Sequence, residues 1–236
     1  MSDVPVRPAS TVVVLRDGPS GLEVLLVRRN RALAFAGGFW VFPGGAVDDS
    51  DREQAEGDPD AAARYAAARE AEEEAGITMD PDAMVLVSHW TTPAAEKKRF
   101  STWFYACVAP ADTDVVIDNS EIHDFRWVGI QQALGEHGRG ELNLMPPTYI
   151  TLRELERYDT ADAAVEGERE TPCPRVLPLM LKIGEREYIT VYPGDAAYSS
   201  GNHEAEGPRH RAYIENGGWR YQYEGCPDET PLFVQD

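Results

Sequence analysis

The chain has 236 residues and a mass of 26.1 kDa, enough for one large domain or for one ordinary domain with an extension. Hydrophobic residues make up 42% of it, so a sizeable core can form and wholesale disorder is excluded. The 22 basic and 41 acidic residues give a net charge of −19, which excludes nucleic acids and anionic membranes as expected partners. An anionic substrate would need divalent cations to screen the repulsion.

The first elements in chain order predict a β-hairpin. Residues 11–15 and 23–28 are rich in Val and Leu, and the segment 17–21 between them, Asp-Gly-Pro-Ser-Gly, has the composition of a turn. Residues 39–42 form a short apolar run that ends at the sequence Pro-Gly-Gly.

A polar loop and one long helix are expected next. Residues 46–60 carry seven acidic side chains, which predicts a solvated loop outside the core. Asp58 suits the N-cap of a helix and Pro59 its first position. Residues 61–75 are rich in alanine and contain no Gly or Pro, and Gly76 is a natural end, so the helix is predicted to run to residue 75.

The remaining chain predicts further strands and helices before and after a change in composition near Tyr158. The expected strands cover residues 85–90, 101–109, 115–117 and 125–128, and the expected helices cover 130–136 and 147–157. Residues 159–170 are small, polar and acidic, which predicts a linker. Two hairpins should follow, 177–183 with 187–192, and 210–215 with 219–224 around Asn216-Gly217.

Cysteines and hydrophobic runs indicate the compartment. Cys107, Cys173 and Cys226 are widely spaced and form no CxxC pair, so neither a disulfide framework nor a cysteine zinc site is predicted. The first residues lack the pattern of a signal peptide, and no apolar run approaches the ~18 residues of a membrane span. We therefore expect a cytoplasmic protein without a membrane partner.

The segment 69–77, Arg-Glu-Ala-Glu-Glu-Glu-Ala-Gly-Ile, is the most informative part of the sequence. At about 100° per residue, Glu70, Glu73 and Glu74 share an arc of roughly 100° on one helix face. Arg69 lies four residues before Glu73 and can pair with it, whereas a hard divalent cation would better neutralise the cluster. By itself such a face is most often a solvated acidic surface.

Its surroundings make this segment resemble the Nudix box, Gx5Ex7REUxEExGU, in which U is aliphatic. Gly45 matches the opening glycine and residues 69–77 match the second half. Arg69 follows Gly45 by 24 positions instead of 14, so ten residues are inserted. Counted back from Arg69, the pattern's first Glu falls on Ala61, with Asp58 and Asp60 as neighbouring candidates to replace it.

The resemblance implies a site for Mg²⁺ or Mn²⁺. Glu70, Glu74 and the carbonyl of Gly44 would be ligands, and Glu73 would be a further ligand or would be held by Arg69. The family often recruits another catalytic carboxylate from a distant loop. Glu121 looks like that group because Trp127-Val128 follows at the familiar offset, although it can also be read as an exposed loop acid, and Glu96 is the second candidate.

Other segments resemble the branch of the family that hydrolyses coenzyme A. These are residues 25–45, which end in Phe-Pro-Gly-Gly, the insertion inside the box, and residues 144–148 ahead of a Leu-rich helix. The basic residues expected to bind substrate are Arg28, Arg31, Lys98 and Arg99, with ordinary solvated charge as the alternative for the last two.

We therefore expect an α/β/α Nudix sandwich with a mixed sheet over residues 8–157, followed by a linker and a β-rich extension over 158–236. The expected reaction is metal-dependent hydrolysis of a pyrophosphate bond in a nucleoside diphosphate derivative. CoA or acyl-CoA is the first substrate, and ADP-ribose or a dinucleotide such as NADH is the alternative. A non-catalytic module that binds such a ligand, or a partner protein, also stays open. Many relatives are dimers, so a homodimer is open too.

Overall fold

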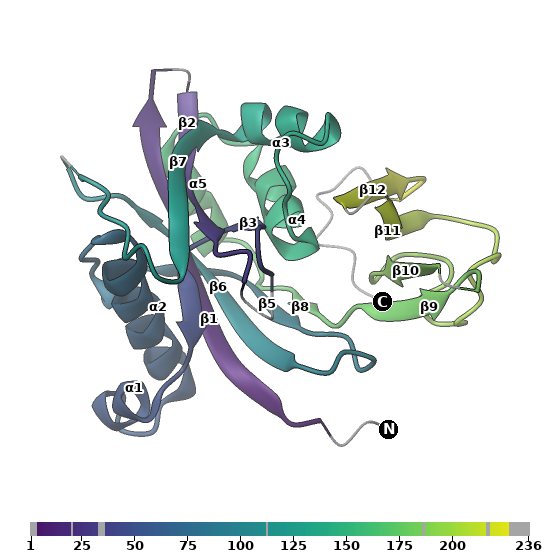
Figure 1. Ribbon diagram of the computed structural model, residues 1–236, viewed down its shortest axis with the longest axis horizontal. Helices are drawn as coiled ribbons and strands as arrows, with labels where there is room; N and C mark the ends of the chain where they lie inside the picture. Colours follow the sequence, from purple (N-terminus) through teal and green to yellow (C-terminus); the bar gives the residue numbers. More distant parts are fainter. Residues whose placement is uncertain are drawn as a thin grey trace.

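A mixed β-sheet forms the centre of the computed structural model, which describes residues 4–19, 21–32, 36–111, 113–185, 187–215 and 218–226. Its strand order is β3-β2-β1-β6-β5-β8, with β4 paired to β1 and β7 paired to β2 (Figure 1). β1 runs parallel to β6 and antiparallel to β2, so the predicted first hairpin is confirmed. The strands are β1 (Val6–Gly18), β2 (Gly21–Arg29), β3 (Trp40–Val41), β4 (Gly44–Ala46), β5 (Val85–Thr91), β6 (Arg99–Val108), β7 (Ile122–Gly129) and β8 (Arg175–Val176).

Helices cover both faces of this sheet, as the expected α/β/α sandwich requires. Even-numbered β1 residues such as Val12 and Val14 pack with α2, and odd-numbered ones such as Val13 and Leu15 share a core with α4 and α5. Figure 1 shows α1 and α2 on one side and α3, α4 and α5 on the other. The helices are α1 (Asp49–Gln54), α2 (Pro59–Ala75), the 3-10 turn η1 (Pro81–Ala83), α3 (Ile130–Gly138), α4 (Pro146–Leu155) and α5 (Ala161–Arg169).

α2 has the bounds that the sequence predicts. The Asp58 side chain accepts hydrogen bonds from the first turn, and Gly76 adopts φ 69°, the left-handed conformation that ends many helices. Alanines at positions 63, 67, 71 and 75 are fully buried against the sheet. Because these side chains are so small, the helix lies close to the strands, and its carboxylates are carried toward β4.

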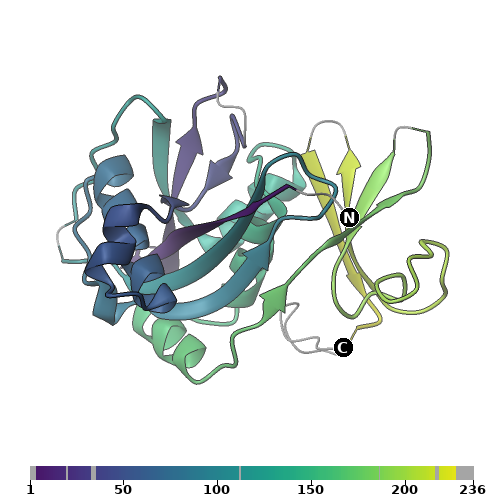
Figure 2. The ribbon, with the colours of Figure 1, turned by 90° about the horizontal axis from the view of Figure 1, so that it is seen from below.

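A second, antiparallel sheet has the strand order β12-β11-β10-β9 and lies at the end of the molecule away from α2 (Figure 2). Its strands are β9 (Leu179–Lys182), β10 (Tyr188–Val191), β11 (Arg209–Glu215) and β12 (Gly218–Glu224). Both predicted hairpins are confirmed, although the Asn216-Gly217 turn lies outside the described residues. Tyr221 packs on Tyr149 of α4 with ring centroids 5.4 Å apart, so the β-rich extension is joined to the first sheet by aromatic packing.

Three predicted elements are wrong. Residues 46–60 are not simply a loop, because 49–54 form α1, whose first turn is stabilised by a capping box between Asp48 and Asp51. The expected linker 159–170 contains α5, whose residues Ala161, Ala164 and Val165 complete the main core. Residues 115–117 form no strand, since the N–H of Val116 donates to the carbonyl of Ala75 and so satisfies the end of α2. The division of the chain at residue 157 stays a prediction.

Candidate active site

Two glycines of β4 bring the carboxylates of α2 against the backbone. Glu74 is only 5% exposed, and the N–H of Gly44 donates to its Oε2 at 3.0 Å. A Cβ on Gly45 would lie 2.3 Å from Oε1 of Glu70, so only glycine leaves room for that carboxylate. The strand is held in place by β1, where the Thr11 hydroxyl donates to the carbonyl of Pro43 at 2.6 Å.

Arg69 links the carboxylates to one another, and the predicted pairing with Glu73 is confirmed. Its Nη1 lies 2.9 Å from Oε1 of Glu70 and 3.2 Å from Oε2 of Glu73. Its Nε and Nη2 donate to the two oxygens of Asp51 at 3.2 and 3.0 Å, a bidentate contact. The hydrogen bond with Asp51 is the largest cause that raises the pKa of Arg69 above its ordinary value, so the guanidinium stays charged.

Asp51 was missed by reasoning from the sequence. It is 3% exposed in α1 and also accepts the N–H of Asp48 at 2.8 Å. Counting forward from Gly45 places it after five residues, where the box has its first Glu, whereas counting back from Arg69 gives Ala61. The insertion therefore follows Asp51, and the count from the glycine is the signal that could have identified it. Asp58 and Asp60 instead begin α2.

A second guanidinium, that of Arg29 at the end of β2, lies between Glu74 and Glu121. Nη1 of Arg29 is 3.7 Å from Oε1 of Glu74, and its Nη2 is 3.3 Å from Oε2 of Glu121. β7 brings Glu121 there, because Ile122 pairs with Arg29 in the ladder between β2 and β7. The structure thus brings Glu121 to the α2 carboxylates, whereas Glu96 is exposed in the turn between β5 and β6.

Burial controls the protonation of the two inner carboxylates. It raises the pKa of Glu74 to about 8, against the opposing effects of the Gly44 N–H and the Arg29 charge. Burial also raises the pKa of Glu70, which Arg69 partly offsets. Because burial penalises the charged form of both groups, a cation among these oxygens would offset that penalty.

The four basic residues expected at the substrate lie apart from this cluster. Arg28 faces the opposite side of the sheet from Arg29, with its guanidinium carbon 5.8 Å from the Trp40 ring centroid. Arg31 is exposed beside Gly38. Lys98 is exposed, and Arg99 donates to the carbonyl of Thr92 at 3.2 Å. Their roles stay predictions, and the nearby basic group that the sequence did not single out is Arg29.

The donor set of the cluster fits a hard divalent cation, since the available side-chain ligands are carboxylate oxygens. In the described part of the chain, no three His, Cys, Asp or Glu side chains already converge closely enough to hold a metal ion. Arg69 and Arg29 lie among the carboxylates instead, and each neutralises two or more of them. Metal binding would therefore require these ion pairs to rearrange.

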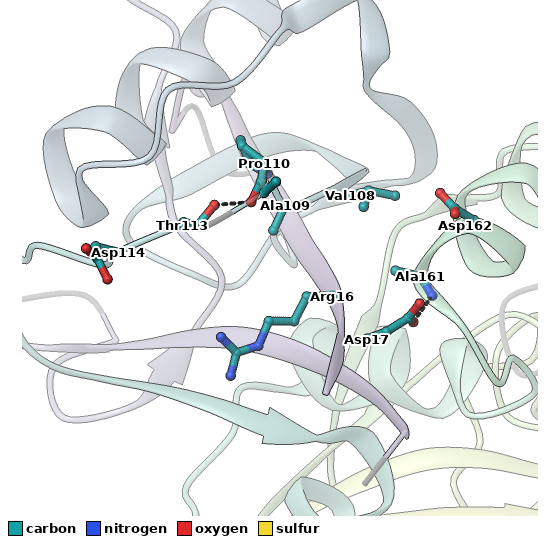
Figure 3. A pocket seen from close by; sticks show the side chains of 10 residues that line it. Arg16, Asp17, Val108, Ala109, Pro110, Thr113, Asp114, Ala161 and Asp162 are labelled. Atoms are coloured by element: carbon teal, nitrogen blue, oxygen red, sulfur yellow. Dashed lines mark hydrogen bonds between the residues drawn. The ribbon is translucent and has the colours of Figure 1, made fainter. Parts of the chain in front are cut away.

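An open cleft of about 520 Å³ lies elsewhere, between the ends of β1 and β6 and the start of α5 (Figure 3). Asp17 closes one side by accepting the N–H of Ala161 at 2.8 Å. Arg16 already has interaction partners. It pairs with Glu23 at 2.7 Å, and its guanidinium carbon lies 4.2 Å from the Trp127 ring centroid. None of the candidate site residues lines this cleft.

Comparison with known proteins decides the family. The model of the NUDIX domain matches residues 6–146, more than half of the chain and the part that contains the carboxylate cluster. The chain belongs to the Nudix family. A crystal structure of a NUDIX hydrolase from Alicyclobacillus acidocaldarius is 27% identical, with a TM-score of 0.64 over 70% of this chain and 97% of that one. The resemblance in the sequence is thus confirmed, and the protein is a Nudix hydrolase with an added C-terminal sheet.

Two similar proteins carry names that mention coenzyme A. "Peroxisomal coenzyme A diphosphatase ndx-8" of Caenorhabditis elegans is 32% identical over 57% of this chain and 56% of its own length. "Acyl-coenzyme A diphosphatase NUDT19" of Xenopus laevis is 27% identical over 47% of this chain and 31% of its own length. The chain thus spans a little under a third of one of these relatives and a little over half of the other.

The location of the protein and its state of association stay predictions. Over the ranges that the structure describes, no helix combines the length and apolar character needed to cross a membrane.

Proposed function

We propose that this Nudix hydrolase cleaves the pyrophosphate bond of a nucleoside diphosphate derivative, with CoA or acyl-CoA as substrate, and that it requires Mg²⁺ or Mn²⁺. The observation that carries the proposal is the contact of Glu70 and Glu74 with the backbone of Gly44 and Gly45. It positions one buried carboxylate, Glu74, and one half-buried carboxylate, Glu70, beside a strand whose glycines allow close approach. Two further carboxylates, Glu73 and Glu121, stand at the exposed rim of the same cluster.

Each residue of the cluster is assigned one role in the proposed reaction. Glu70, Glu73, Glu74 and the Gly44 carbonyl would hold the cation, which supplies charge stabilisation to the phosphoryl oxygens and lowers the pKa of the attacking water. Arg69 would orient Glu70 and Glu73, as its two hydrogen bonds to them indicate. Glu121, whose side chain is 58% exposed, is our choice to accept the proton from that water, with Glu73 as the alternative.

The choice of CoA rests on the segments that resemble the CoA branch, on the names of the two relatives, and on where the basic residues lie. In the ladder, Gly45 pairs with Ser10 and Ser10 with Trp103, and Arg99 lies four residues before Trp103 along β6. At roughly 3.3 Å per residue, Arg99 lies about 13 Å along β6 from the level of Gly45, and it is two strands away from that glycine. We therefore assign Lys98 and Arg99 to a distant anionic group of an extended substrate rather than to its diphosphate.

A substrate panel with matched variants tests the proposal. Product formation would be measured with CoA, acyl-CoA, ADP-ribose and NADH in the presence of Mg²⁺ or Mn²⁺. Glu74→Gln should reduce kcat at least 100-fold, because it removes a carboxylate oxygen that would bind the cation. Glu72→Gln is the control, since Glu72 is exposed on the same helix and points away from the cluster.

Each result of the substrate panel supports or contradicts one part of the proposal. Turnover of ADP-ribose or NADH but not of CoA would mean that the substrate is ADP-ribose or a dinucleotide and not CoA. Binding of these compounds without turnover of any of them would favour the non-catalytic module. Equal activity of Glu74→Gln and the wild type would refute the site.

A further inference from the structure

Arg29 occupies the space between two carboxylates that the sequence separates widely. Glu74 comes from α2 and Glu121 precedes β7, yet the guanidinium contacts both, at 3.7 and 3.3 Å. Its side chain is only 18% exposed. Its Nε is buried and has no hydrogen-bond partner within the part of the chain that the structure describes. A guanidinium that is largely removed from water but not fully hydrogen-bonded is an unstable arrangement.

The arrangement is explained if Arg29 takes the place of another cation. Glu74 and Glu121 repel one another, and Glu70 adds to the repulsion at Glu74. The guanidinium between them is what holds these two carboxylates, from different elements, close to one another. We propose that Arg29 is the resident counter-cation of the metal-free protein, and that a divalent cation must displace its guanidinium from Glu74 and Glu121 in order to bind.

Displacement gives the guanidinium a second role. The end of β2 is fixed by its ladder with β7, so Arg29 stays beside the cluster after it leaves the carboxylates. A guanidinium next to a divalent cation is repelled unless an anion joins them, and the diphosphate of the proposed substrate is such an anion. Arg29 is therefore a positioning residue that opposes the metal before substrate binds and supports the substrate afterwards. The inference rests on the proposed function, because it assumes a divalent cation at this site.

Arg28 provides a matched control. It is the neighbouring residue and carries the same charge, but it faces the other side of the sheet, where its guanidinium carbon lies 5.8 Å from the Trp40 ring centroid. Within the described residues its guanidinium forms no ion pair with a carboxylate of the cluster, whereas both terminal nitrogens of Arg29 contact one. A general effect of removing one positive charge from the chain would appear in both variants.

Calorimetric titration with Mn²⁺, without substrate, tests the displacement. The wild type is compared with Arg29→Gln and Arg28→Gln. Arg29→Gln should bind Mn²⁺ about tenfold more tightly, within the range usual for two coupled sites, and Arg28→Gln should keep the wild-type Kd. With saturating Mn²⁺, Arg29→Gln should instead raise the KM for the turned-over substrate. If Arg29 only supported the fold, Arg29→Gln would bind both the metal and the substrate more weakly than the wild type.

A second variant and a second readout keep the inference falsifiable. Arg29→Lys keeps one positive charge but cannot bridge two carboxylates, so its Kd for Mn²⁺ should lie between those of wild type and Arg29→Gln. If Arg29→Gln does not fold in EDTA, Mn²⁺ should restore its thermal transition. If the wild type binds Mn²⁺ and Arg29→Gln binds it equally tightly or more weakly, the inference about Arg29 is overturned while the proposed function stands. No uptake by the wild type would overturn the proposed function and this inference with it.

Discussion

The contact between Asp51 and Arg69 is expected to support both the stability and the activity of the protein. Asp51→Asn keeps the shape of the side chain but replaces one acceptor oxygen by a donor. That donor faces Arg69 in either orientation of the amide, and in one of them it also faces the N–H of Asp48. Breaking a fully buried ion pair costs about 3–5 kcal/mol. Arg69 is 24% exposed and keeps its contacts with Glu70 and Glu73, so we expect a loss of about 2 kcal/mol in the free energy of unfolding.

A loss of that size should lower Tm by about 4–8 °C in a chain of this length, which differential scanning fluorimetry measures easily. We also expect kcat to fall about tenfold, because Arg69 would no longer hold Glu70 and Glu73 in one orientation. Asp49→Asn is the matched control, since Asp49 lies on the same short helix, is 96% exposed and, among the residues that the structure describes, pairs only with Arg52 at the surface. It should change stability by less than about 0.5 kcal/mol. Equal changes in Tm and kcat for the two variants would refute the reasoning.

Two further predictions concern a buried histidine and the paired glycines. Burial lowers the pKa of His210 to about 4, so between pH ~6.5 and 4 the folded state binds fewer protons than the unfolded state, and stability should fall by up to about 3 kcal/mol as the pH is lowered through that window. Urea midpoints at pH 7.5 and 4.5 should show a smaller fall for His210→Gln, and the same fall in both proteins would contradict the assignment. Gly44→Ala would place a Cβ 2.6 Å from Cα of Thr11, a backbone atom, and should destabilise the protein by about 3 kcal/mol. Gly45→Ala meets the Glu70 carboxylate instead, so kcat should fall far more than Tm; the opposite ranking of the two variants would count against the site.

Local features of the sequence predicted the part of the site that lies on one helix. Asp58, Gly76 and the alanines between them define α2, because capping and helix propensity act within a few residues. The same periodicity placed Glu70, Glu73 and Glu74 on one face and Arg69 beside Glu73, as observed. The hairpins were also predictable, since alternating apolar residues around turn residues are a short-range signal.

Elements with small or acidic residues were read incorrectly for a physical reason. α1 is rich in acidic residues, and α5 is rich in alanines and acidic residues. Such short segments become helices only when caps and a neighbouring surface stabilise them. The apolar face of α5, with Ala161, Ala164 and Val165, is too narrow to stand out until the sheet against which it packs is known. Residues 115–117 have the composition of a strand, but no strand edge accepts them, and Val116 instead satisfies the end of α2.

The sequence by itself determined the family, the carboxylates expected to bind a metal ion and the helix that carries them. All of these depend on spacing along one continuous segment. Only the tertiary structure decided which charges neutralise that cluster. Asp51 and Arg69 are 18 residues apart, and Arg29 and Glu121 are 92 apart. Each pair meets because strands and helices that are distant in the chain pack together. No local pattern encodes which of two adjacent arginines, Arg28 or Arg29, will face the buried acids, since that choice depends on which side of the sheet α2 covers.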